Sequence, residues 1–238
     1  MARTRQRTPR NEQPKPKADQ FRNMREVVAK STPQKEYLES ISNNTLTFGV
    51  GPAGTGKTFL AVYQALCHLW SKKCRRIIIS RPVIEAGEKL GFLPGDLNMK
   101  MDPFIRPIMD SMIDIIGFDE MKLKMDKGVI EIAPLAFMRG RTFNDAFIIL
   151  DESQNCTYEQ LKMAVTRLGH NSKCVINGDP AQSDLPNSGL KAIIEALTPV
   201  EDIGVTHFTA AEVERSEIVK SIVSALEKFE NETERRQR

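Results

Sequence analysis

Residues 51–58 read Gly-Pro-Ala-Gly-Thr-Gly-Lys-Thr and directly follow the apolar run Leu-Thr-Phe-Gly-Val at 46–50. A strand, a glycine-rich turn and then a helix from Lys57 form the usual setting of a phosphate-binding loop. Glycines let the backbone curl so that successive N–H groups face an anion, and the helix N-terminus adds a partial positive charge. We therefore expect an α/β fold that binds the phosphates of a nucleotide here.

The whole loop is expected to line the nucleotide site. Lys57 can reach the β- and γ-phosphates, and the Thr58 hydroxyl can ligate Mg²⁺. The binding residues predicted from the motif are Gly51, Pro52, Ala53, Gly54, Thr55, Gly56, Lys57 and Thr58. The alternative is a glycine-rich turn with an incidental lysine, and the preceding strand argues against it.

A second apolar strand ends in two carboxylates, because residues 147–152 read Phe-Ile-Ile-Leu-Asp-Glu. Asp151 would bind the nucleotide's Mg²⁺ together with Thr58. Glu152 would deprotonate or orient the attacking water, a role that a protein that only binds nucleotide does not need. The pair therefore favours hydrolysis over binding alone, with a helix-capping Asp-Glu pair as the alternative.

A third strand at 173–177 runs into Gly-Asp-Pro-Ala-Gln at 178–182. A glutamine at this edge of the sheet can hydrogen-bond both a γ-phosphate oxygen and the water. We therefore expect Gln182 to sense the γ-phosphate, although the turn alone would be an ordinary loop.

Apolar strands alternate with amphipathic helices along the rest of the chain, a pattern typical of a parallel sheet covered on both faces. We expect a single P-loop NTPase core of the RecA-like type over 19–230, with a helical insert at about 82–127. Helices are predicted at 19–29, 34–41, 57–70, 157–168, 190–197 and 214–229. Strands are predicted at 46–50, 76–80, 129–132, 146–150, 173–177 and 203–208.

Composition is that of an ordinary globular protein, with 40% hydrophobic and 27% charged residues. No apolar run could span a bilayer, and no apolar segment follows the N-terminal arginines, so we expect a cytoplasmic protein. The four cysteines form no C-x-x-C pair, which favours reduced thiols over a zinc site.

The positive charge is concentrated in residues 1–17, which carry six basic side chains and one acidic one. We expect a disordered basic tail at 1–18 and a frayed end at 231–238. Such a tail can contact nucleic acid phosphates, or it can be a purely local run of charge.

Several longer segments resemble the PhoH family of phosphate-starvation-inducible ATPases, which are related to superfamily-one helicase cores. They are the phosphate loop, Arg-Pro-Val-Ile-Glu-Ala-Gly-Glu-Lys-Leu-Gly-Phe-Leu-Pro-Gly at 81–95, Asp-Pro-Phe-Ile-Arg-Pro at 102–107, Pro-Leu-Ala-Phe-Met-Arg-Gly-Arg-Thr at 134–142, Asp-Glu-Ser-Gln-Asn at 151–155 and Gly-Asp-Pro-Ala-Gln at 178–182. Ser153 stands where relatives often have alanine. From the length of the sequence we expect none of the extra domains that some relatives carry.

The resemblance implies further roles. Gln34 matches the glutamine that reads the adenine edge, which implies ATP as the nucleotide. Arg215 matches an arginine before the last helix and is the candidate arginine finger. Single-stranded nucleic acid, RNA more than DNA, is the implied partner. Four arginines could sense phosphate or contact nucleic acid, or could instead form surface salt bridges: Arg81, Arg139, Arg141 and Arg167.

One ATPase core leaves a helicase-type site half open, because two-domain helicases close two cores around ATP. We therefore expect a homo-oligomer with a hexameric ring as its candidate form, in the host cytoplasm if the chain is phage-encoded. Three alternatives stay open: an ATP-gated binding protein, an assembly protein that uses ATP to hold a ring together, and a small-molecule kinase.

Overall fold

A computed structural model describes residues 24–82, 97–213, 218–219 and 222, with the backbone alone over 97–104. The expected basic tail, nearly all of the last predicted helix and Arg215 lie outside these residues. The boundaries predicted at 18/19 and 230/231 stay predictions for the same reason.

Six strands in the described part of the chain form one sheet in the order β3-β2-β4-β5-β1-β6. Every pairing in it is parallel. The strands are β1 (Leu46–Val50), β2 (Arg76–Ser80), β3 (Ile130–Ile132), β4 (Ala146–Leu150), β5 (Lys173–Gly178) and β6 (Ile203–His207). The carboxyl ends of the strands therefore meet at one edge, where ligands bind in open sheets of this type. The predicted parallel sheet is confirmed.

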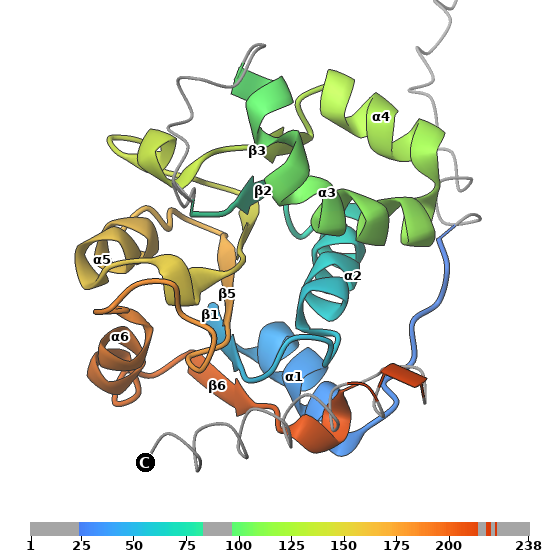
Figure 1. Cartoon of the computed structure of the whole chain (residues 1–238). Helices are drawn as coiled ribbons and strands as arrows, with labels where there is room; N and C mark the ends of the chain where they lie inside the picture. The colour runs from blue at the N-terminus through green and yellow to red at the C-terminus, as the bar shows by residue number, and fades with distance from the viewer. Residues whose placement is uncertain (1–23, 83–96, 214–217, 220–221, 223–238) are drawn as a thin grey trace, which may run out of the picture.

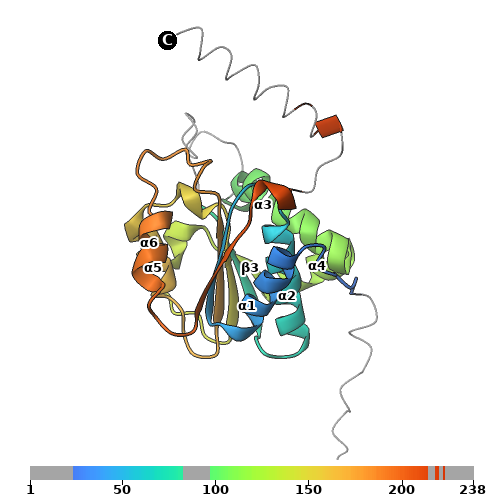
Figure 2. The ribbon, with the colours of Figure 1, turned by 90° about the horizontal axis from the view of Figure 1, so that it is seen from below.

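Helices cover both faces of the sheet, which Figure 2 shows nearly edge-on. One face carries α1 (Thr32–Asn43), α2 (Lys57–Trp70), α3 (Leu97–Ile116) and α4 (Phe118–Asp126) (Figure 1). The other carries α5 (Tyr158–Val165) and α6 (Leu190–Leu197). The short 3₁₀ turns are η3 (Leu135–Met138), η4 (Ser153–Asn155) and η5 (Ala210–Glu212). None of the described helices is long and apolar enough to cross a membrane.

The continuous apolar strands supply two separate cores. In β2, Ile77 and Ile79 pack with α1 to α4, whereas Ile78 packs with α5 and α6. The same alternation holds in β4, where Ile149 faces the first core and Ile148 the second. Burial on both faces explains why these strands read as apolar runs rather than as alternating patterns.

Two helix predictions were wrong in their bounds at the N-terminal side. Residues 24–30, the described part of the helix expected at 19–29, are not helical. They form an irregular segment whose Arg25 N–H donates to the Ile115 carbonyl at 2.9 Å. The helix expected at 34–41 begins earlier, at Thr32, because Ser31 caps it and proline is tolerated in a first turn.

One further helix differs from its prediction, because the helix expected at 157–168 ends at Val165, where Thr166 becomes its C-cap. The described part of the insert expected at about 82–127 contains α3 and α4. Ile105, Ile108 and Met112 of α3 are buried in the core with α2 and the sheet, and the insert as a unit stays a prediction.

Candidate functional site

The phosphate loop connects β1 to α2 at the carboxyl edge of the sheet. Gly51, Gly54 and Gly56 have φ angles of 141°, 81° and 83°, which favour glycine. A Cβ on Gly51 would lie 2.3 Å from the Phe208 carbonyl oxygen. Neighbouring strands hold the loop in place, since the Gly51 N–H donates to the Gly178 carbonyl at 3.1 Å. The sequence therefore fixes this turn through glycines that no other residue could replace without strain.

Lys57 starts α2 and folds its side chain back over the loop, where it is 8% exposed. Its ammonium donates to three loop oxygens: the carbonyls of Gly51 at 2.7 Å and Pro52 at 2.6 Å, and Thr55 Oγ1 at 3.2 Å. A triphosphate on the same loop would offer this ammonium anionic acceptors in place of neutral ones.

Thr58 and Asp151 meet across the edge of the sheet, and the Thr58 hydroxyl donates to Asp151 Oδ1 at 2.9 Å. Asp151 directly follows β4 and is 4% exposed. A hydroxyl and a carboxylate are hard oxygen donors of the kind that Mg²⁺ takes in nucleotide sites. The two residues predicted to bind the metal are thus side by side and chemically suited to it.

Burial shapes the charges of the site. It lowers the pKa of the Lys57 ammonium, while the carboxylates of Asp179, Asp151 and Glu152 act in the opposite direction. It raises the pKa of the Asp151 carboxyl, and the charge of Glu152 adds to this rise. A cation bound beside Asp151 would relieve both effects on that carboxyl.

Glu152 follows directly in a left-handed conformation, with φ 54° and ψ 38°. A non-glycine residue there is strained, and such strain gathers at functional sites. Its carboxylate pairs with Arg81 Nη2 at 3.0 Å and accepts from Gln154 Nε2 at 2.5 Å. Gln154 in turn accepts the Asp179 backbone N–H at 3.0 Å. The carboxylate is therefore held in one orientation between β2 and β5.

Gln154 is a site residue that sequence reasoning missed. It is 3% exposed and ties the Glu152 carboxylate to the turn after β5. Its position in the Asp-Glu-Ser-Gln-Asn run at 151–155 was the available signal, but nothing local in that run indicates that the turn after β5 lies beside it.

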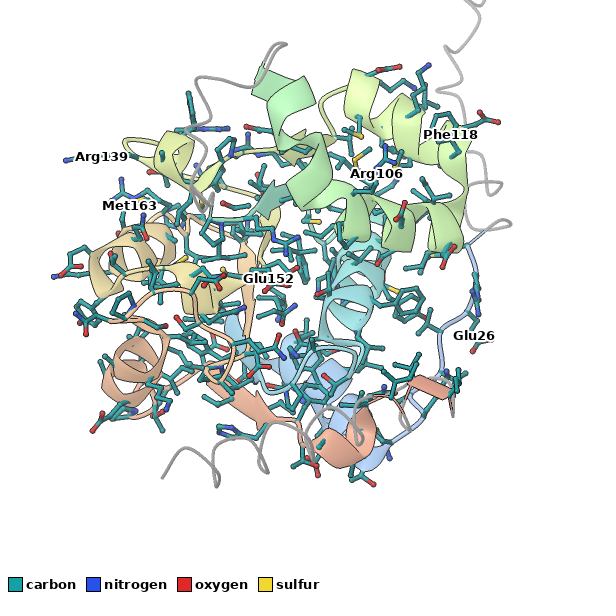
Figure 3. All side chains as sticks on the ribbon, in the orientation of Figure 1. Glu26, Arg106, Phe118, Arg139, Glu152 and Met163 are labelled. Carbon is teal, nitrogen blue, oxygen red and sulfur yellow. The ribbon has the colours of Figure 1, made fainter. Side chains whose placement is uncertain are left out.

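Two neighbouring cavities open along the loop. The first, of about 250 Å³, brings together most of the predicted site: it is lined by Ala53, Gly54, Gly56, Lys57, Thr58, Phe59, Pro107, Ser111, Asp151, Glu152, Gln154, Asn177, Gly178, Asp179 and Gln182. The second, of about 620 Å³, shares Gly54, Gly56 and Phe59 with the first and extends to Gln34 and the 25–30 segment. In the view of Figure 3, Glu152 lies near the centre, between α5 on one side and α2 on the other.

The structure also places Gln34 and Gln182, the two glutamines predicted to contact the nucleotide. Gln34 is 4% exposed, donates from Nε2 to the Thr55 carbonyl at 3.2 Å and accepts the Lys30 N–H at 2.8 Å. It thus lies on the second cavity and contacts the loop. Gln182 lines the first cavity from an exposed turn. Arg215 is outside the described residues.

Sequence comparison finds close relatives. A family model described as "PhoH-like protein" matches residues 26–227. A PhoH-like protein of Mycobacterium tuberculosis (strain H37Rv) is 49% identical over 207 residues, which are 86% of this chain and 59% of that protein. Protein PhoH of Escherichia coli (strain K12) is 41% identical over 204 residues, 84% of this chain and 58% of that protein. The chain spans less than two thirds of the length of these relatives.

Structural comparison finds the same type of fold in distant proteins. The large terminase of a thermophilic bacteriophage matches 81% of this chain and 49% of its own, with a TM-score of 0.53 and 12% identity. The same terminase in complex with ADP gives a TM-score of 0.51 at 13% identity, over 81% of this chain and 49% of its own. At such low identity the similarity is one of fold, and the fold is that of P-loop ATPases.

Proposed function

The chain belongs to the PhoH-like protein family, and we propose that it hydrolyses ATP with Mg²⁺ as the metal. One observation carries the proposal: Lys57, Thr58, Asp151 and Glu152 line a single cavity at the carboxyl edge of the sheet. A cation, two metal-binding oxygens and a carboxylate that can accept a proton are together what phosphoanhydride hydrolysis requires.

Each side chain has a distinct part in the proposed reaction. The Lys57 ammonium and the loop N–H groups bind the β- and γ-phosphates, and Thr58 and Asp151 would hold Mg²⁺, which neutralises phosphate charge. Glu152 accepts the proton of the attacking water as the bond to the γ-phosphorus forms and the bond to the leaving ADP oxygen breaks. Gln182 would orient that water and contact the γ-phosphate.

Adenine is the proposed base, because the second cavity adjoins the loop next to Gln34 and Phe59. The Phe59 ring offers a surface for stacking. The Gln34 amide carries a donor and an acceptor that match the adenine edge once it turns from its present partners. A terminase of similar fold was solved in complex with ADP, which supports an adenine nucleotide as the ligand.

Coupling to single-stranded nucleic acid is the second part of the proposal, with RNA as the favoured polymer. Its support is the η3 surface, which we define as Phe137, Arg139 and Arg141. Phe137 is 56% exposed, although its neighbours in the turn, Leu135 and Met138, are buried. Arg139, two positions after Phe137 in the sequence, is also exposed. Proteins that bind single-stranded nucleic acid commonly stack bases on aromatic rings and bind phosphates with arginines.

The η3 surface also lies where it could respond to nucleotide. It follows β3, whose parallel pairing places its carboxyl end on the edge that holds the nucleotide cavity. Arg141 anchors the segment, because it pairs with Glu131 at 2.5 Å and lies 4.6 Å from the centre of the Phe143 ring. The turn leaves Phe137 and Arg139 exposed, and Figure 3 shows Arg139 at the outside of the molecule.

Turnover and binding in the Glu152→Gln variant test the proposed function. Without a proton acceptor, this variant should bind Mg²⁺–ATP with an affinity within a few-fold of wild type but release phosphate at least about 100-fold more slowly. Glu159→Gln, the same change at an exposed position of α5, serves as the control. Normal hydrolysis by Glu152→Gln would refute the role of Glu152. Turnover that no RNA or DNA changes would instead favour an ATP-gated binding or assembly protein.

A further inference from the structure

Asn177 lies in β5 beside Gly178 and lines the first cavity, yet it belongs to none of the motifs above. It is 1% exposed. Its Oδ1 accepts the Tyr37 hydroxyl, while its Nδ2 is buried and has no hydrogen-bond partner within the described part of the chain. A buried donor without an acceptor costs stability, and native proteins rarely keep one unless a ligand or water completes it.

The Tyr37 hydroxyl determines which way this amide points. A hydroxyl that donates to Oδ1 sets the amide orientation, so that Nδ2 lies on the other side. Burial raises the pKa of Tyr37 well above its usual value, and the nearby charge of Asp151 adds to the rise, so the hydroxyl stays a donor at neutral pH. Tyr37 therefore holds Asn177 in a single orientation.

Asn177 lines the same cavity as the metal-binding carboxylate of Asp151, together with Lys57 and Thr58. Its Nδ2 makes no hydrogen bond of ordinary length and angle to any of them. The unpartnered N–H₂ group therefore belongs to the wall of the cavity where a metal–triphosphate would bind.

The fold makes room for this pair and connects it to the phosphate loop. A Cβ on Gly49 would lie 2.6 Å from Asn177 Oδ1 and 2.8 Å from the Tyr37 ring, so β1 needs glycine there. Phe208 supports the Tyr37 ring edge-on at 5.4 Å. One turn before Tyr37 on α1, Gln34 bonds the Thr55 carbonyl of the loop. A single helix therefore contacts both the loop and Asn177.

We propose that Asn177 is a further ligand-binding residue of this site and that Tyr37 is its positioning residue. Asn177 Nδ2 donates to an oxygen of the bound metal–nucleotide, either a γ-phosphate oxygen or a metal-bound water. The proposal rests on the proposed function, because the ligand is the Mg²⁺–ATP assigned to this cavity. It adds a contact that links α1, and hence the base-side cavity, to the γ-phosphate end of the site.

Four variants test the pair: Tyr37→Phe, Asn177→Ala, the double variant, and Tyr158→Phe as a control that removes a hydroxyl from α5. Tyr37→Phe keeps the buried ring, and melting curves check that each variant is folded. We expect Asn177→Ala to lower kcat at least about tenfold, and Tyr37→Phe about fivefold with KM for ATP changed less than about twofold. The double variant should be no slower than Asn177→Ala, because Tyr37 acts through Asn177.

Binding of Mg²⁺–ADP and of a non-hydrolysable Mg²⁺–ATP analogue distinguishes the two acceptors. If the acceptor is a γ-phosphate oxygen, Asn177→Ala weakens binding of the analogue and leaves ADP unchanged. If it is a metal-bound water, both bind more weakly and both need more Mg²⁺ for half-maximal binding. Unchanged binding and turnover in Asn177→Ala, or additive effects in the double variant, would overturn the proposal.

The wild-type protein separates this proposal from the proposed function. Wild type that binds nucleotide but releases no phosphate would refute hydrolysis, and the binding measurements would still decide whether Asn177 contacts the ligand. Wild type that binds no adenine nucleotide would refute both. A Tyr37→Phe variant that behaves like Tyr158→Phe in every measurement would refute the positioning role alone.

Discussion

Asp151 places a carboxylate where water barely reaches it, and only the Thr58 hydroxyl bonds it at ordinary hydrogen-bond length among the described residues. Taking a charge out of water is costly unless an opposite charge compensates it. Burial and the charge of Glu152 raise its pKa accordingly. The charged Asp151 carboxylate therefore destabilises the folded protein without metal, and a bound cation would remove this penalty.

Asp151→Asn should stabilise the metal-free protein at neutral pH while abolishing turnover. A carboxyl whose pKa is raised on folding favours the folded state fully only below its unfolded value of about 4. This contribution is lost as the pH rises through the folded pKa. The stabilisation by asparagine should therefore grow between the unfolded and the folded pKa. We expect the free energy of unfolding of Asp151→Asn to exceed that of wild type by about 1 kcal/mol or more at pH 7. Thermal melts without Mg²⁺ between pH 4 and 7 measure it.

Glu195→Gln, which neutralises a carboxylate on α6, is the control for this measurement and should change the melting temperature little. An Asp151→Asn protein that melts below wild type at pH 7 would contradict the account of Asp151 as a desolvated charge.

Site residues that stand in local motifs could be predicted, and site residues outside such motifs could not. Lys57, Thr58, Asp151 and Glu152 follow motifs that are local, and the structure brings them to one cavity. The Tyr37–Asn177 bond joins residues 140 positions apart, and neither one stands in a motif that the sequence reveals. Such a pair depends on the order of strands in the sheet, which periodicity alone does not give.

Among the elements, strands were easier to predict than the connections between them. Buried runs such as Ile-Ile-Ile at 77–79 are β-branched on both faces and have no competing helical pattern. The 24–30 segment has a helix-like composition, yet its partly buried Met24 and Val27 pack against the core in an irregular conformation. Tertiary packing overrides local propensity there.

The phosphate loop should be intolerant of side chains at its first glycine. Gly51→Ala would need a positive φ and would bring Cβ within 2.3 Å of the Phe208 carbonyl oxygen. We therefore expect the free energy of unfolding to fall by at least about 2 kcal/mol and nucleotide binding to be lost. Gly128→Ala is the matched control, because φ is +65° but nothing lies within 4 Å. It should cost about 1 kcal/mol, through backbone strain alone. Chemical denaturation measures both, and equal losses would contradict this account.

The η3 surface gives an element-scale test of nucleic acid binding. Phe137→Ala should weaken binding of a fluorescent single-stranded RNA about tenfold, because base stacking on an aromatic ring is lost. Arg139→Ala should make the plot of log binding constant against log salt concentration less steep, by about the amount expected for one lost phosphate contact.

Phe118→Ala is a closely matched control for that test. Phe118 is also 56% exposed, but it lies on α4, across the molecule from Arg139 (Figure 3). Equal effects of Phe137→Ala and Phe118→Ala would argue against a specific site at η3. A change in sedimentation with Phe137→Ala would instead identify this surface as a contact between protein copies.

At the scale of the whole molecule, the described site lies along the carboxyl edge of one sheet, and the side of it that carries Glu152 is exposed. The Glu152 side chain is 39% exposed, and Gln182 lies on the surface. Hydrolysis is faster when a site excludes bulk water around the single attacking water molecule and when an arginine neutralises the transferring phosphoryl group. A second copy of the chain could supply both, which is why we propose an oligomer, with a hexameric ring as its candidate form.

Sedimentation with Mg²⁺ and a non-hydrolysable ATP analogue should therefore show a species larger than the monomer. If Arg215 is the finger, Arg215→Ala should assemble normally and lose turnover by about 10³-fold or more. A strict monomer that hydrolyses ATP at the full wild-type rate would contradict the shared site.

Release of inorganic phosphate from ATP, measured with and without Mg²⁺, tests the central claim most directly. We expect Mg²⁺-dependent release by wild type, unchanged release by Lys191→Ala on the exposed side of α6, and a loss of at least about 100-fold in Lys57→Ala, because the phosphates lose their cation. A folded wild-type protein that releases no phosphate, or a Lys57→Ala variant that releases it normally, would contradict the account.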